Sequence, residues 1–209
     1  MSNKKKFKLG ELFCGPGGFA EGARQAGFHH VWAVDNHHDS CISFGNNQEG
    51  TVYTMEIEEF IRKEHLKKLE KIEGLLFGFP CNDFSLVGKN KKLKGEYGGL
   101  YKKACDALDY LKPNFFVAEN VTSIGKTFKT AKEHRREAQK NHLASTNYKN
   151  FKQIMGDLAN CTKYGYRVYA DNYKFEEHGI PQTRHRMILV GFRDDFFNKN
   201  KINFERIEK

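Results

Sequence analysis

Reactive side chains follow or precede several short apolar runs of this chain, and their types are those of a nucleophilic enzyme site. Cys81 comes after Pro80, just beyond the apolar run at 75–77. Glu119 ends a second apolar run, and Arg184 and Arg186 come just before a third. A thiol can add to an electron-poor carbon, a carboxyl group can transfer a proton, and a guanidinium can stabilise negative charge as it develops. The residues together predict chemistry that needs all three groups.

Apolar runs alternate with segments of helical character along the chain, which indicates how these side chains are positioned. We expect strands at 8–13, 31–34, 75–79, 115–119, 167–172 and 186–192, and helices at 19–25, 39–46, 58–71, 101–111 and 148–159. The alternation predicts an α/β fold with a doubly wound, mostly parallel sheet. Ligands of such sheets bind beyond the carboxyl ends of the strands, so the thiol, the carboxyl group and the guanidiniums are expected to meet there.

The composition is that of one globular domain. The 209 residues are 39% hydrophobic and 13% aromatic, which argues against a disordered chain. No apolar run approaches the roughly 20 residues that span a bilayer, and the basic N-terminus lacks the apolar stretch of a secretory signal. We therefore expect a cytoplasmic protein with no membrane partner.

Cysteines and histidines give no sign of a disulfide framework or a metal site. The five cysteines are an odd number without CxxC spacing, so free and mostly buried thiols are expected. His29, His30, His37 and His38 lack matching cysteines or carboxylates and are interpreted as surface or capping residues.

The charge balance favours a polyanionic partner. Thirty-five Lys and Arg residues against 26 Asp and Glu residues give a net charge of +9, as is typical of nucleic-acid-binding proteins. Residues 87–99 are rich in Lys and Gly and are expected to form a mobile loop. Residues 126–147 are polar and basic; they are either a solvated insertion or a face for nucleic acid or a partner protein.

A glycine-rich turn at 13–19 joins the first expected strand to the first helix. Its glycines let the backbone turn tightly and approach a ligand, and the N–H groups at the helix start can receive an anionic group. The turn is neither GxGxxG nor followed by GK[ST], so it is not expected to cradle phosphates. Asp35, about twenty residues on, can accept both hydroxyls of a ribose. A cofactor carrying a nucleoside is predicted, and a purely structural turn is the alternative.

Four motifs occur in the order found in the cytosine-5 DNA methyltransferases, at 13–19, 78–85, 119–121 and 179–186. From about residue 9 to residue 193 the sequence resembles that family. The resemblance implies a Rossmann-like methyltransferase fold that depends on S-adenosylmethionine, with residues 1–209 as the catalytic domain. It also implies a cytosine flipped out of double-stranded DNA as the substrate.

The resemblance assigns roles to the reactive residues. Cys81 would add to C6 of the cytosine and so activate C5 toward the methyl group. Glu119 would bind or protonate N3 and hold the exocyclic amine. Arg186 would bind O2, and Arg184 would hold Glu119 or a backbone phosphate.

The family's binding residues carry over by position. The cofactor would be lined by Phe13, Cys14, Gly15, Gly17, Gly18, Asp35, Asn36, Glu56, Ile57, Pro80 and Leu100. The DNA would be contacted from a catalytic loop at about 82–99 by Ser85, Lys89, Lys91, Lys92 and Lys94. The lysines would add salt-dependent affinity through phosphate contacts.

The chain departs from the family pattern in details and at its end. Asn82 stands in place of the usual glutamine, Asp35 of a glutamate and Glu56 of an aspartate, and Thr183 takes a place that is often basic. A target-recognition region and a Gly-Asn segment that completes the cofactor site are expected in the family and are missing from these 209 residues. We expect the catalytic subunit or a fragment of a split enzyme, with both segments on a second polypeptide; a truncated gene product and an inactive binding protein are the alternatives.

The predicted function is therefore that of a DNA (cytosine-5-)-methyltransferase of a bacterial restriction-modification system. Two alternatives stay open at this point. One branch of the same family methylates tRNA, and the motifs do not separate it from the DNA enzymes. A regulatory or DNA-binding subunit without turnover is the other alternative.

Overall fold

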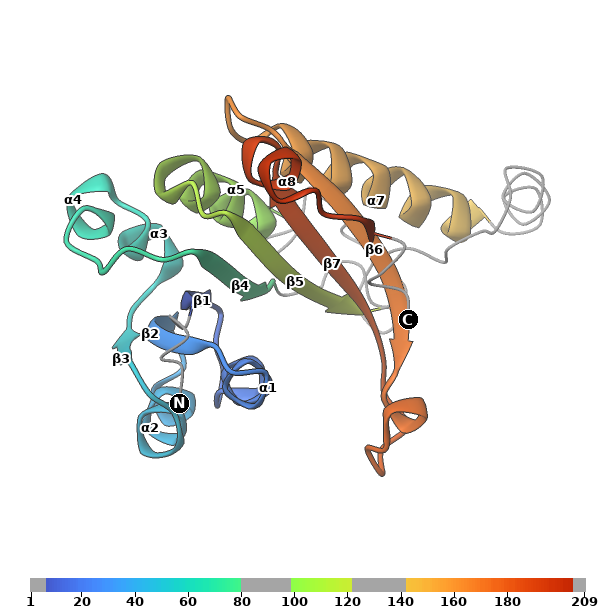
Figure 1. The fold of residues 1–209 in the computed structure, drawn as a ribbon. Helices are drawn as coiled ribbons and strands as arrows, with labels where there is room; N and C mark the ends of the chain where they lie inside the picture. Colours follow the sequence, from blue (N-terminus) through green and yellow to red (C-terminus); the bar gives the residue numbers. More distant parts are fainter. Residues whose placement is uncertain (1–6, 80–98, 122–141, 205–209) are drawn as a thin grey trace.

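A computed structural model gives the fold for residues 7–79, 99–121 and 142–204, with side chains described outside 142–150. Within these ranges, seven strands form one sheet in the order β3-β2-β1-β4-β5-β7-β6 (Figure 1). The strands are β1 (Lys8–Leu12), β2 (His29–Asp35), β3 (Thr51–Thr54), β4 (Gly74–Gly78), β5 (Phe115–Val121), β6 (Tyr166–Lys174) and β7 (His185–Arg193). The expected α/β class and mostly parallel sheet are confirmed, since only β7 pairs antiparallel, with β5 and with β6.

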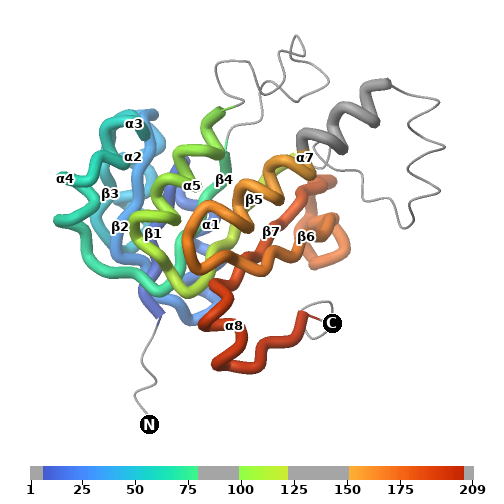
Figure 2. Tube along the Cα trace, turned by 90° about the horizontal axis from the view of Figure 1, so that it is seen from above, coloured from blue at the N-terminus to red at the C-terminus, as the bar shows by residue number. Residues whose placement is uncertain are grey.

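Helices cover both faces of the sheet. They are α1 (Gly18–Gln25), α2 (His38–Asn47), α3 (Ile57–Phe60), α4 (Lys63–Leu66), α5 (Leu100–Leu111), α7 (His142–Asn160) and α8 (Asp194–Asn200), with a 3-10 turn η3 at Phe175–His178. α5 and α7 lie side by side over one face, whereas α1 and α2 lie on the other (Figures 1 and 2). This is the doubly wound arrangement that the alternation of elements predicts.

The main core lies between the sheet and the α5–α7 layer. Trp32, Phe77 and Phe116 project from the strands and are fully buried, together with Tyr101 of α5 and Phe60 of α3. Trp32 lies across the β1 backbone, where a Cβ on Gly10 would come within 2.2 Å of the indole. Glycine at this position therefore lets the largest side chain of the core reach the sheet.

Three expectations about local structure are corrected. The helix expected at 58–71 is two short helices, α3 and α4, because Arg62 between them takes an extended conformation. Phe60 of α3 packs on Trp32 at a ring separation of 5.5 Å. β3 was not expected, since its Thr51–Thr54 sequence has no apolar run. The helix expected at 148–159 begins earlier, since α7 starts at His142.

His30 is also corrected. It was interpreted with its neighbours as a surface or capping residue, but only 6% of it is exposed. His37 does cap a helix, because its Nδ1 accepts a hydrogen bond from the backbone N–H of Ser40 in α2. No helix of the described residues has the length and apolar character to cross a membrane.

Candidate functional site

The turn between β1 and α1 has an unusual backbone. Phe13, Gly15 and Gly17 all have positive φ, at 57°, 53° and 97°. A left-handed phenylalanine is uncommon and costs conformational energy, so such residues concentrate at functional sites. Gly17 is buried, and a Cβ there would come within 2.8 Å of the Gln48 side chain. The sequence therefore forms a tight concave turn that ends at the start of α1.

Asp35 holds this turn in place from the end of β2. One of its carboxylate oxygens accepts a hydrogen bond from the backbone N–H of Gly15 at 2.9 Å, and the other accepts one from His37 at 2.9 Å. Each oxygen keeps a further lone pair, so the carboxylate can still accept ribose hydroxyls.

The residues predicted to surround the nucleoside lie together at the ends of β2 and β3. Asn36 donates to both carboxylate oxygens of Glu56 at 3.3 Å. Met55 N–H donates to the Asp35 carbonyl at 3.1 Å, which brings the chain just before Glu56 beside Asp35. Ile57 is buried at the start of α3. Leu100 lies apart from them, at the start of α5, half-buried against the main core.

Glu119 and the two arginines meet between β5 and β7. Arg186 Nε lies 2.5 Å from Glu119 Oε1, and Arg184 Nη2 lies 3.9 Å from the same oxygen. The Glu119 side chain is 25% exposed and that of Arg184 is 42% exposed. Of the two arginines, Arg186 thus makes the close contact with the carboxylate; Arg184, predicted to hold Glu119 or a backbone phosphate, lies farther from it.

One cavity connects the two halves of the site. It has a volume of about 470 Å³ and runs from the β1–α1 turn to Glu119 and Arg184. Phe13, Cys14, Gly18 and Phe19 line one part; Gly78, Phe175, Ile180, Gln182 and Ile188 complete the wall. Burial, followed by the nearby carboxylates of Glu11 and Asp35, raises the pKa of the Cys14 thiol far above its ordinary value. Cys14 is therefore a protonated wall residue rather than a nucleophile.

Seven predicted site residues lie outside the described residues: Pro80, Cys81, Ser85, Lys89, Lys91, Lys92 and Lys94. Phe79, the last described residue before them, is buried against Tyr101 at a ring separation of 6.1 Å. Its carbonyl accepts a hydrogen bond from the buried Asn120 side chain at 3.1 Å. The chain thus leaves β4 from a fixed point beside β5, which carries Glu119.

Glu11 was not singled out from the sequence, although it lines the same cavity. It lies in β1, is 2% exposed, and has its Oε2 3.4 Å from Nε2 of the equally buried His30. Burial, followed by the charge of Asp35, raises the pKa of Glu11 well above its ordinary value. Burial, followed by the charge of His29, lowers the pKa of His30 to about 4. The available sequence signal was a carboxyl group between Leu9 and Leu12 in an expected strand.

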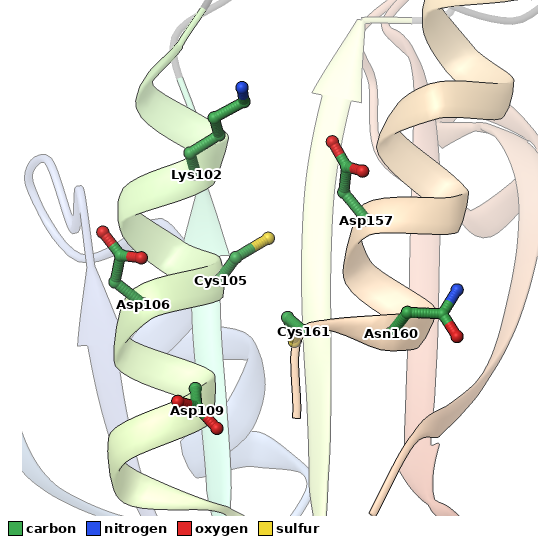
Figure 3. A pocket seen from close by; sticks show the side chains of 7 residues that line it. All are labelled: Lys102, Cys105, Asp106, Asp109, Asp157, Asn160 and Cys161. Carbon is green, nitrogen blue, oxygen red and sulfur yellow. The ribbon is translucent and has the colours of Figure 1, made fainter. Parts of the chain in front are cut away.

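A second cavity, of about 390 Å³, lies between α5 and α7, away from these residues. Figure 3 shows Cys105 projecting from α5 toward α7, with Asp157 and Cys161 on the opposite side of the gap. The four described cysteines are free thiols, as expected; Cys14 and Cys41 are buried, and Cys105 and Cys161 are half-buried. None of the residues predicted for the site lines this second cavity.

Comparison with solved structures places the fold. A candidate DNA modification methyltransferase encoded within an E. coli prophage superposes with a TM-score of 0.63 at 24% identity, over 96% of this chain and 50% of that one. The S. pombe Dnmt2 methyltransferase superposes with a TM-score of 0.57 at 12% identity, over 91% of this chain and 50% of that one. The architecture is thus shared with methyltransferases.

Comparison of sequences gives the family. The Type II methyltransferase M.BbvI of Brevibacillus brevis is 38% identical over 205 residues, covering 91% of this chain and 50% of that protein. The Type II methyltransferase M.NgoFVII of Neisseria gonorrhoeae is 37% identical over 194 residues, covering 93% of this chain and 46% of that protein. The chain spans about half the length of these relatives. The C-5 cytosine-specific DNA methylase family matches residues 7–209, and the chain belongs to that family.

Proposed function

We propose that this chain carries the catalytic machinery that transfers a methyl group from S-adenosylmethionine to C5 of a cytosine flipped out of double-stranded DNA. The observation that carries the proposal is the single cavity lined both by the β1–α1 turn and by Glu119 with Arg184. A methyl donor bound at the turn and a base bound at Glu119 would share one space, as direct transfer between them requires.

The residues of the turn fit such a cofactor. Asp35 offers carboxylate oxygens for a ribose, Phe13 and Phe19 offer aromatic surface, and the buried Glu11 offers an unpartnered oxygen to a cationic group. S-adenosylmethionine supplies an electrophilic methyl group on a cationic sulfur, along with a nucleoside and an ammonium group. The ribose, the aromatic base and one cationic group of the cofactor therefore have matching groups among these residues.

In the proposed mechanism, Cys81 adds as a thiolate to C6 of the flipped cytosine, forming a covalent adduct and making C5 nucleophilic. Glu119 binds N3 and the exocyclic amine and delivers a proton as negative charge builds on the ring. Arg186 orients Glu119 through the 2.5 Å contact and would stabilise negative charge at O2. After methyl transfer, a base removes the C5 proton and the Cys81–C6 bond breaks.

A trapping experiment tests this proposal against a subunit without turnover. DNA containing 5-fluorocytosine cannot lose the C5 substituent, so an active enzyme with cofactor stays covalently attached and survives denaturing electrophoresis. An adduct that forms with the parent chain and is missing for Cys81→Ser supports catalysis. Absence of the adduct from the parent, even with partner segments added, favours a regulatory subunit.

A methyl-transfer assay with labelled S-adenosylmethionine separates the DNA enzyme from the tRNA enzyme. Labelled methyl groups should enter double-stranded DNA and not tRNA. The Type II names of the two relatives support a restriction-modification setting for this chain as well. The predicted second polypeptide, with target recognition and the Gly-Asn segment, stays a prediction, as does a cytoplasmic location; reconstitution of sequence-specific methylation from two chains would support the former.

A further inference from the structure

The pair Glu11–His30 is an anomaly of the buried sheet. Glu11 Oε2 and both ring nitrogens of His30 are buried and have no hydrogen-bond partner, although Oε2 and Nε2 lie only 3.4 Å apart. Buried polar atoms are nearly always hydrogen-bonded, because leaving one unpaired costs about 1–3 kcal/mol. Three such atoms, in two neighbouring side chains on adjacent strands, indicate a pair that can bind a further polar or charged group.

The cavity offers that partner a place. Glu11 lines it together with Phe13, Cys14 and Phe19 of the cofactor turn. His30 does not line the cavity; its ring packs against Phe44 of α2, with 5.6 Å between the ring centroids. The titratable groups that act on the pair are Asp35 and His29 of β2 and Cys14 after β1, with Cys41 of α2 acting on Cys14.

We propose that the Glu11–His30 pair holds one exchangeable proton and that a cationic group of the cofactor displaces it, so that cofactor binding is coupled to proton release. The proposal rests on S-adenosylmethionine as the proposed cofactor and names His30 as the positioning residue of the pair. Without cofactor, Glu11 is a neutral acid and His30 a neutral imidazole. In the complex, the Glu11 proton leaves to solvent and the carboxylate faces the cation.

His30 stabilises the ionised state in this scheme. Its neutral ring can carry the proton on Nε2 and donate it to the adjacent Oε2, which becomes a stronger acceptor once Glu11 is ionised. Loss of this donor should disfavour ionisation of Glu11, so proton release on cofactor binding should occur at higher pH. A glutamine at position 30 has an amide N–H with similar reach and should restore the donor.

Calorimetric titration of the 209-residue chain in buffers of different ionisation heats counts the protons released. Below about pH 7 an α-ammonium group stays protonated, so changes in that range come from the protein. We expect close to one proton per cofactor bound, and a Kd that falls about tenfold per pH unit on the acid side of the Glu11 titration. Binding without release of more than about 0.2 protons overturns the inference and leaves the proposed function standing. Failure to bind S-adenosylmethionine at any pH, also after addition of the second polypeptide, contradicts both.

Two further ligands identify the displacing charge. S-adenosylhomocysteine keeps the ammonium and lacks the sulfonium, and 5′-methylthioadenosine carries neither charge. Proton release with both charged ligands supports the inference with the ammonium as the cation, and release with S-adenosylmethionine alone supports it with the sulfonium. Release on binding of uncharged 5′-methylthioadenosine overturns the inference.

Variants test the pair itself. Glu11→Gln should abolish proton release and make the Kd independent of pH below about pH 7. His30→Phe should shift the pH at which half a proton is released upward, and His30→Gln should return it toward the parent value. His38→Gln is the matched control, because His38 is 75% exposed on α2 and is not among the groups that shift the pKa of Glu11 or His30; the variant should release protons over the same pH range as the parent. An unchanged profile in His30→Phe overturns the role of His30, even if Glu11→Gln does not fold.

Discussion

Arg186 and Glu119 face each other diagonally across the antiparallel pair of β5 and β7. Glu119 is registered with Ile188, and Arg186 is two residues away on the same strand, so both side chains point to the same side of the sheet. The contact of 2.5 Å is therefore imposed by the strand register. Arg184 lies before β7 begins and reaches the carboxylate only at 3.9 Å.

The two arginines should differ in their effect on catalysis. We expect Arg186→Gln to slow adduct formation with 5-fluorocytosine DNA by about 10²–10³-fold, because the close, half-buried charge partner of the reacting carboxyl group is lost. Arg184→Gln should slow it by less than about tenfold, as a more exposed and longer ion pair is worth little. Single-turnover rates with saturating cofactor give the comparison. Equal losses in the two variants would contradict this division of roles.

Cys81→Ser should abolish methyl transfer and leave the fold intact. A hydroxyl is far less ionised than a thiol near neutral pH, so it cannot add to C6 at a useful rate. Methyl incorporation into duplex DNA is the measurement, with Cys161→Ser as the control, since Cys161 lies in the second cavity between α5 and α7. Activity of Cys81→Ser within tenfold of the parent would refute the nucleophile assignment.

Asp35→Asn should weaken cofactor binding by at least about tenfold. An asparagine has one acceptor oxygen, whereas Asp35 accepts from both Gly15 and His37, so one backbone N–H of the turn would face an amide donor. The Kd for S-adenosylmethionine from calorimetry tests this. Asp39→Asn, on the exposed surface of α2, is the control and should leave the Kd unchanged. A turn that does not need the carboxylate would show the same Kd in both variants.

Replacing Lys89, Lys91, Lys92 and Lys94 with glutamine should weaken DNA binding evenly across sequences. Each phosphate that is neutralised contributes a slope of roughly −0.9 to the logarithmic salt dependence, so the slope should flatten by up to about three units. Affinities measured over a series of salt concentrations give the slope. Exposed Lys63, Lys67, Lys68 and Lys71 serve as a control set of equal charge. A changed sequence preference with an unchanged slope would mean that the segment reads bases.

The stability of the protein should depend on pH in opposite ways when each member of the buried pair is removed. The folded-state pKa of His30 is lowered from 6.5 to about 4. Between these two pH values the unfolded chain therefore binds a proton at His30, whereas the folded chain does not. His30 alone therefore removes about 3 kcal/mol of stability as the pH falls through this range. The folded-state pKa of Glu11 is raised, so Glu11 alone removes stability as the pH rises above 4.5.

These two effects oppose each other in the parent between about pH 4.5 and 6.5. Relative to the parent, Glu11→Gln should become less stable toward acid, and His30→Phe should become less stable as the pH rises. Urea unfolding at a series of pH values gives both slopes. Parallel curves for the parent and the two variants would show that neither group is perturbed by folding.

The parts of the fold that the sequence predicts are those marked by local signals. Apolar runs predict the central strands, and the glycines at 15 and 17 predict the turn, because positive φ is readily available to glycine. β3 lies at the sheet edge and is only half-buried, so its strand character comes from pairing with β2 and not from hydrophobicity.

The site is predictable by residue type and less so by contact. The motif residues identify Glu119, Arg184 and Arg186, yet which arginine makes the close contact depends on the β5–β7 register. The Glu11–His30 pair depends on β1 and β2, whose register shifts between Leu9 and Gly10. Such a shift leaves no local signature, so the meeting of these two side chains could be found only from the assembled sheet.

The antiparallel direction of β7 also determines where a fluorophore or a surface tether can be attached to the protein. β7 starts at the cavity and ends at the opposite end of the sheet, where Arg193 N–H donates to the Asn114 carbonyl and α8 begins. The exposed Lys199 of α8 and Lys201 just after it thus follow the end of β7 that is away from Glu119. A fluorophore or a surface tether at these positions would leave the cavity open, so duplex binding could be followed on single immobilised molecules.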